Sequence, residues 1–172
     1  VKQPVLELAK EYINEDKEVR TAEEAVSGAR DIIAESISDE ADYRIWIRKI
    51  TAQKGRAVSL AKDEKADSVY EMYYDFEEPV GKLAGHRVLA LNRGEKEKFL
   101  AVKIEAPEKD IIRYLEKKTI HGNNEYTEPI LKEAVADAYK RLIAPAIERE
   151  IRNDLTERAE DGAIDVNGKN LE

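Results

Sequence analysis

The chain has 172 residues, of which 42% are hydrophobic and 38% carry a charge, a composition that favours a helical protein with long solvated faces. Its net charge of -8 argues against non-specific binding of nucleic acid by the chain as a whole. The lack of cysteine excludes disulfides and thiolate metal sites, and no apolar run approaches the roughly 20 residues of a membrane span, so we expect a cytoplasmic protein without membrane partners.

Helical signals dominate the first 55 residues. Pro4 and the apolar pattern that follows it predict a helix over residues 4–13. Residues 21–24 read Thr-Ala-Glu-Glu, a capping box, and predict a second helix with a buried stripe of Ala25, Ala29, Ile32, Ile33 and Ile37. A third helix is expected to begin after its N-cap, Asp39, and to end at Gly55, with an apolar face of Ala41, Ile45, Trp46 and Ile50.

The middle of the chain combines two strand candidates with a short helix. Residues 56–60 show a brief alternation that is compatible with a strand, and residues 99–105 are apolar, include β-branched residues and are ended by Pro107. Between them, residues 86–93 favour a helix with Gly94 at its C-terminal cap. The aromatic residues Tyr70, Tyr73 and Tyr74 fall on one helical face, and we interpret them as core residues rather than base-stacking groups.

The last third is again helical. We expect a short amphipathic helix over residues 108–118, a turn at His121, and a long helix capped by Thr127 that kinks or restarts at Pro145. Its stripe continues through Ile147, Ile151 and Leu155. The predicted fold is mainly α and multi-helical, with at most a small β-hairpin. The predicted division is a helical region with a small β element over residues 1–125, the long kinked helix over 126–159, and a linker over 160–172.

Motifs of catalysis and cofactor binding are missing from the sequence. It contains no phosphate-binding glycine loop, no dinucleotide fingerprint, no His-Glu-x-x-His and no nucleophile elbow. The two histidines, His86 and His121, lie 35 positions apart and offer little material for a catalytic triad or a zinc site. We therefore expect a protein that is not an enzyme and needs neither a cofactor nor a metal.

Two basic blocks interrupt the acidic chain. Residues 43–62 contain six Lys or Arg and no acid, and residues 82–103 contain six Lys or Arg against two acids. Cations gathered in this way, with Tyr43 and Trp46 among them, have the ingredients of a phosphate-binding surface. The candidate contacts are Arg44, Arg48, Lys49, Lys54 and Arg56 in the first block, and Arg87, Arg93, Lys96 and Lys98 in the second. The alternative is that the first block pairs with the acidic residues before it.

One stretch carries a recognisable order of residues. It reads Tyr74-Asp75-Phe76-Glu77-Glu78-Pro79 and continues with His86-Arg87-Val88-Leu89-Ala90-Leu91-Asn92-Arg93-Gly94-Glu95. This pattern resembles the signature of the Tex family of bacterial transcription accessory proteins, in their N-terminal region. Among the signature residues, His86, Arg87, Leu89, Arg93, Gly94 and Glu95 are interpreted as structural. We expect Leu89 and Leu91 to be buried, and His86, Arg87 and Arg93 to connect neighbouring elements.

The resemblance implies a non-catalytic part of a protein that acts on RNA or DNA, with helix-turn-helix-like elements. It also implies that the chain is a fragment, because the family's RNase-H-like domain, helix-hairpin-helix units and C-terminal OB-fold RNA-binding domain have no counterpart here. The implied partners are RNA or DNA, the missing C-terminal domains and the transcription machinery. The alternative is a scaffold for proteins or domains that makes no nucleic-acid contact of its own. A monomer is expected, since the chain is acidic and has no long heptad run.

Overall fold

The computed structural model describes residues 21–122 and 124–171, with side chains up to residue 162, so the helix expected over residues 4–13 lies outside the described residues. The chain divides into two compact units, each built from two separate segments. The first unit holds the described residues up to Trp46 together with Glu108–Pro145. The second unit holds Ile47–Pro107 and the chain from Ala146 onward. The expected division into residues 1–125, 126–159 and 160–172 stays a prediction about the order of segments along the chain.

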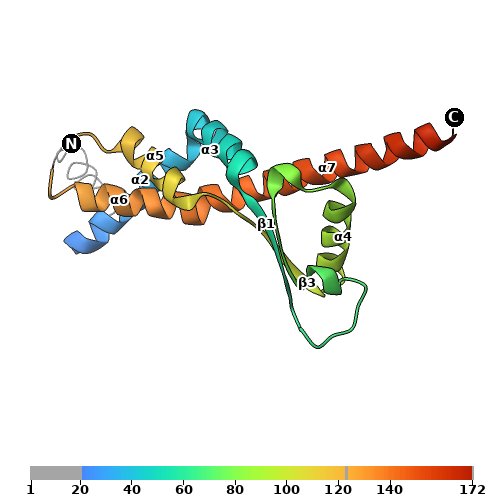
Figure 1. Cartoon of the computed structure of the whole chain (residues 1–172). Coiled ribbons are helices and arrows are strands. Elements are labelled where there is room, and N and C mark those ends of the chain that lie inside the picture. The colour runs from blue at the N-terminus through green and yellow to red at the C-terminus, as the bar shows by residue number, and fades with distance from the viewer. Residues whose placement is uncertain (1–20, 123, 172) are drawn as a thin grey trace. The chain divides into compact units, whose positions relative to one another are not determined.

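Helices make up the first unit (Figure 1). They are α2 (Ala22–Asp39), the start of α3 (Ala41–Lys54), α5 (Glu108–Thr119), α6 (Glu128–Asp137) and a π-helical turn, η3 (Ala138–Ile143). The capping box that begins α2 is confirmed: Glu24 N donates to Thr21 Oγ1 (3.1 Å), and Thr21 N donates to the Glu24 carboxylate (3.3 Å). Because these bonds satisfy N–H groups that have no partner within the helix, α2 begins where the sequence predicts.

The packing face of α2 differs in part from the expected stripe. Ala25, Ala29 and Ile37 are buried as predicted, but Ile32 is 44% exposed. Ala34, which the sequence does not single out, is fully buried. Since α2 packs against α6 and η3, its small alanines allow a close approach of the helices that a larger side chain would prevent.

The face of α3 is also rotated from the expected one. Ile45, assigned to the apolar face, is 66% exposed, whereas Ile47 and Thr51 are buried. Asp39 is the last residue of α2 and therefore does not cap α3. The expected stop at Gly55 is confirmed, because α3 ends at Lys54.

The long C-terminal helix has an irregular start. Thr127 stands at the N-cap of α6, but its hydroxyl makes no capping bond, and Asn124 Oδ1 instead accepts from the N–H groups of Tyr126 and Thr127. The α-helical pattern gives way to η3 and resumes in α7 (Ala144–Leu171), so the restart expected at Pro145 is confirmed. Pro145 has no N–H to donate, and a π turn is a known way to accommodate such a gap.

A three-stranded antiparallel sheet is the centre of the second unit. Its strands are β1 (Arg56–Ala61), β2 (Asp75–Pro79) and β3 (Leu100–Glu105), in the order β2-β1-β3. The two expected strands are confirmed, but the expected hairpin is corrected to three strands, with β1 pairing on both sides. Ser59 lies opposite Phe76 on one neighbour and Val102 on the other, so these three side chains share the buried face of the sheet.

The aromatic residues before β2 are core residues, as expected, but they do not share a helix. Tyr70 and Tyr73 are buried beside a 3-10 turn, η1 (Glu71–Tyr73), and pack with Leu91 and Leu100. Tyr74 lies one residue later, where the chain enters β2, and is only half-buried.

Helices α4 (Gly85–Lys96) and α7 complete the second unit. A 3-10 turn, η2 (Val80–Lys82), connects β2 to α4. The helix expected over residues 86–93 is confirmed, and α4 packs against β3 (Figure 1). The stripe of Ile147, Ile151 and Leu155 on α7 is buried as predicted. Helix α7 continues through the tail to Leu171, and the role of that tail as a linker stays a prediction. None of the described helices has both the length and the apolar character needed to cross a membrane.

Candidate nucleic-acid interface

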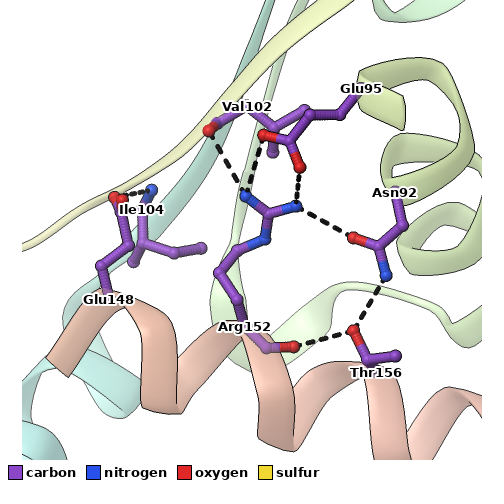
Figure 2. A network of polar contacts seen from close by, with 7 residues as sticks. All are labelled: Asn92, Glu95, Val102, Ile104, Glu148, Arg152 and Thr156. Atoms are coloured by element: carbon purple, nitrogen blue, oxygen red, sulfur yellow. Dashed lines mark hydrogen bonds and ion pairs between the residues drawn. The ribbon is translucent and has the colours of Figure 1, made fainter. Parts of the chain in front are cut away.

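Arg152 of α7 is the centre of the main polar network of the second unit. Its Nη2 donates to Glu95 Oε1 (2.7 Å) and Asn92 Oδ1 (2.9 Å), both on α4 (Figure 2). Its Nη1 donates to the second oxygen of Glu95 (3.3 Å) and to the carbonyl of Val102 on β3 (3.4 Å). Since the Arg152 side chain is only 20% exposed, this charged fork ties three elements together in a partly dry environment.

Side chains of α7 also satisfy the free edge of the sheet. β3 is an edge strand, and Glu148 accepts a hydrogen bond from the N–H of Ile104 (2.8 Å; Figure 2). Together with the bond from Arg152 to the Val102 carbonyl, this pairs backbone groups that would otherwise be available to another strand. Arg152 and Glu148 were not predicted as site residues, because no local pattern indicates which backbone groups a remote helix meets.

Two signature residues, Glu95 and Arg87, make contacts between elements of the second unit. Glu95 is the carboxylate partner of Arg152. Arg87 lies 3.9 Å from the Glu78 carboxylate and 5.5 Å above the ring of Phe76, so it connects α4 to β2. His86 and Arg93, however, are exposed and have no side-chain partner among the described residues, which corrects the expectation that they connect elements.

Gly94 is not the C-terminal cap of its helix. α4 continues to Lys96, with Glu97 at its C-cap, and Gly94 is buried inside the last turn. A Cβ atom added at Gly94 would lie 2.4 Å from Leu100 Cδ1 and 2.8 Å from its Cγ. Glycine is therefore required for the close approach of α4 to β3 rather than for ending the helix.

Arg44 and Arg56 of the first basic block have partners within their own units. Arg44 donates from Nε to the Ser38 carbonyl (2.5 Å) and from Nη2 to the Ser38 hydroxyl (3.1 Å), which holds the end of α2. Arg56 pairs across the sheet with Glu77 (2.5 Å). Lys54 at the end of α3 is exposed. These contacts leave Arg48 and Lys49 as exposed side chains on α3 with no partner among the described residues.

In the second basic block, three candidates are exposed. Arg93 and Lys96 lie on α4 at a spacing of three, which puts them on one face of the helix, and Lys98 follows the helix. None of the three has an ion pair among residues 21–162. Thus five of the nine candidates have exposed cationic groups free of such pairs, and all five belong to the second unit.

The described residues include an apolar hollow but no metal-binding cluster. No group of three or more His, Asp or Glu side chains among them is arranged to hold a metal ion. A hollow in the second unit is lined mainly by apolar side chains, among them Val80, Val88, Ile151 and Leu155, and also by Arg158. Arg158 is paired with Asp154 of the same helix (2.5 Å).

Comparison with known proteins agrees with the signature in α4. A family model described as Tex central region-like matches residues 2–167. The chain belongs to the Tex family. The resemblance had implied the N-terminal region of these proteins, whereas the matching description names their central region. The match covers both compact units of this Tex-family chain.

Individual relatives are much longer. The Tex-family chain is 52% identical over 166 residues to the uncharacterized protein YdcI of Bacillus subtilis, which covers 95% of the chain and 23% of that protein. It is 33% identical over 99 residues to protein tex of Bordetella pertussis, a match that covers 56% of the chain and 12% of that protein. It is 27% identical over 160 residues to a transcription elongation factor SPT6 homolog of Arabidopsis thaliana, a match that covers 85% of the chain and 10% of that protein. The chain therefore spans between a tenth and a quarter of the length of these relatives.

Proposed function

We propose that the chain is a non-catalytic module of a transcription accessory protein and that its second unit contacts RNA or DNA through exposed cations. One observation supports this proposal: five of the candidate cations are exposed, make no ion pair with a described residue, and belong to the same unit. They are Arg48, Lys49, Arg93, Lys96 and Lys98. The names of the relatives, which include a transcription elongation factor homolog, favour a role in transcription. Contacts to phosphates supply affinity without sequence preference, so we expect binding that is weak and indifferent to sequence.

Fluorescence anisotropy with labelled 20-nucleotide RNA, single-stranded DNA and duplex DNA at 50 mM salt tests this proposal. Two charge-reversal pairs are compared with the parent, Arg48→Glu/Lys49→Glu on α3 and Arg93→Glu/Lys96→Glu on α4. The matched control is Lys109→Glu/Lys117→Glu on α5 of the first unit, where both lysines are exposed. All three pairs change the net charge by the same amount, so the comparison separates local contacts from overall repulsion.

The expected result is a loss of about tenfold or more for at least one of the second-unit pairs, with little change for the control pair, while circular dichroism is the same for all. An equal loss for the control pair would mean that net charge alone governs binding. A parent that does not bind any of the three probes would contradict the proposal.

The alternative is a scaffold for protein or domain contacts, and one observation favours it. The loop between β1 and β2 presents Val69, which is 84% exposed, and Met72, which is 65% exposed. Hydrogen bonds from the Tyr74 hydroxyl to the Ala66 carbonyl (2.6 Å) and with the Ser68 hydroxyl (2.8 Å) hold this loop in shape. Ordered, exposed apolar side chains in an acidic segment are typical of a protein-binding site. Failure of the parent to bind nucleic acid would leave this function as the better one.

A further inference from the structure

The turn that follows α4 has an unusual backbone. Lys98 has φ of 69°, and no other non-glycine residue that the structure describes has a positive φ. Its N–H donates to the Glu95 carbonyl (3.1 Å), and the N–H of Phe99 donates to the Gly94 carbonyl (2.9 Å). These two bonds form a Schellman motif with Lys98 at the left-handed position, which glycine usually occupies. A side chain with a Cβ atom is strained there.

Stabilisation of the helix end does not account for lysine at this position. A cation near the C-terminus of a helix interacts favourably with the helix dipole, but Arg93 and Lys96 already supply cations to the last turn of α4. Glycine at position 98 would relieve the backbone strain and keep both Schellman bonds. Strained residues that persist in this way concentrate at sites of function.

The surroundings of Lys98 point to an anionic ligand. The N–H of Lys62 donates to the Phe99 carbonyl (3.0 Å), which brings Lys62 beside the turn. The side chains of Lys62, Lys96 and Lys98 are all exposed and form no ion pair with a described residue. Four acids lie in the same segments. Glu95 pairs with Arg152, Glu97 accepts a hydrogen bond from the Tyr70 hydroxyl, Asp63 accepts one from the N–H of Lys65, and Glu64 is exposed. With Arg93 and Arg152 included, the cations at this end of α4 outnumber the acids by one, because Arg152 offsets Glu95.

We propose that Lys98 is held in the left-handed conformation to contact a phosphate of a nucleic-acid backbone, with Lys62 and Lys96 forming the rest of the same contact surface. This inference rests on the proposed function, and it assigns the contact to one end of α4. Lys62 was not among the candidate contacts predicted from the sequence. A phosphate backbone is the ligand expected because compact ammonium groups on flexible stems bind phosphates as point charges.

The test is the substitution Lys98→Gly, measured for both stability and binding in the 172-residue chain. Relief of the left-handed strain should raise the melting temperature by about 1–4 °C. Loss of one phosphate contact should lower the slope of log affinity against log salt by about 0.7–0.9, which corresponds to roughly tenfold weaker binding at 50 mM salt. The probes are the labelled RNA, single-stranded DNA and duplex DNA described above, so that the preferred backbone is identified in the same titrations.

Two control variants make the result specific. Lys98→Arg keeps the charge and should keep the affinity and the salt slope of the parent. Lys109→Gln removes one exposed cation from α5 in the first unit, just as Lys98→Gly removes one exposed cation from the second unit. Lys109→Gln should bind nucleic acid as tightly as the parent does. The proposal is supported if Lys98→Gly is more stable but binds more weakly while both controls match the parent.

Other outcomes overturn it in distinguishable ways. If the parent binds and Lys98→Gly binds equally well with the same salt slope, Lys98 only terminates a helix, and the proposed function stands without this contact. If Lys98→Gly melts at a lower temperature, the argument from strain fails. If the parent does not bind at 50 mM salt, both the proposed function and this inference fail.

Discussion

Leu91 and Leu89 of α4 are neighbours of the same residue type in different environments. Both are expected from the sequence to be buried, but only Leu91 is, at 3% exposure, in a cluster with Tyr70, Tyr73 and Leu100. Leu89 is half-buried, which corrects that expectation. We expect Leu91→Ala to lower the free energy of unfolding by about 2–5 kcal/mol in urea denaturation. Leu89→Ala should cost clearly less, and equal losses would contradict this assignment of the core.

The two glycines Gly94 and Gly162 make a matched pair inside helices. Alanine has the higher helix propensity by about 1 kcal/mol, and Gly162 of α7 has nothing within 4 Å of an added Cβ atom, so Gly162→Ala should stabilise the protein slightly. At Gly94 the same Cβ atom would overlap buried Leu100, and overpacking of about 1–3 kcal/mol outweighs the gain in propensity. Thermal melting should therefore move in opposite directions for the two variants, and a stabilised Gly94→Ala would mean that α4 lies further from β3.

The pKa of the Asp137 carboxyl is lowered mainly by Arg141, with a smaller contribution from the charge of Arg30. Hydrogen bonds from Arg141, one turn later, lower the pKa of Asp137 below its usual value of 3.8. The folded state thus favours the ionised carboxylate, so this pair stabilises the protein above about pH 4, and its contribution is lost as the pH falls through the lowered pKa. Titration of Asp137 by NMR should give a pKa below 3.8 in the parent and a higher one in Arg141→Ala. An unchanged pKa in the variant would mean that Arg141 is not the cause.

At the scale of elements, one arginine makes the charged contacts that join α7 to both α4 and β3. We expect Arg152→Ala to lower the free energy of unfolding by about 1.5–3 kcal/mol, because Glu95 and the Val102 carbonyl lose a charged partner in a partly buried site. Arg158→Ala on the same helix is the control, since its pair with Asp154 is exposed and should contribute less than about 0.5 kcal/mol. Similar losses for the two variants would show that the network is as weak as a surface pair.

Two of the three strands could be predicted from local sequence, and the third could not. β1 was predicted from a brief alternation along the chain, and β3 was predicted because its residues are apolar and include β-branched ones. Both begin and end within one residue of the expected bounds. β2 was missed because its sequence, Asp-Phe-Glu-Glu-Pro, is acidic and ends in proline, which is typical of an edge strand and weak as a local signal. It becomes a strand because β1 offers it a row of backbone partners.

At the scale of the whole molecule, any nucleic-acid binding must overcome a net charge of -8. We expect a contact of three or four phosphates, so affinity should fall by about 20- to 150-fold between 50 and 200 mM salt. Anisotropy titrations across this range check the slope, and probes of unrelated sequence should give the same values. Binding that is insensitive to salt or strongly dependent on sequence would contradict a contact made through phosphates.

The chain order of the segments differs from their grouping in space. Each unit is assembled from an early segment and a late one, so α5 and α6 belong with α2, while α7 belongs with the sheet. The expected division ran along the chain, in blocks of consecutive residues. Composition shifts and proline positions indicate where elements end, but they do not indicate which elements pack together, because packing joins residues that are far apart in sequence.

The sequence by itself determined the family, the capping box of α2, the end of α3 at Gly55 and the buried stripe of α7, because each depends on residues within a few positions of one another. Tertiary structure decided the role of Gly94 and the position of β2. It also decided which cations are free for a ligand: Arg44, Arg56 and Arg87 have partners, whereas Arg48, Lys49, Arg93, Lys96 and Lys98 are exposed. The physical reason is that charge is a property of a residue, whereas its availability depends on partners that only the fold brings near.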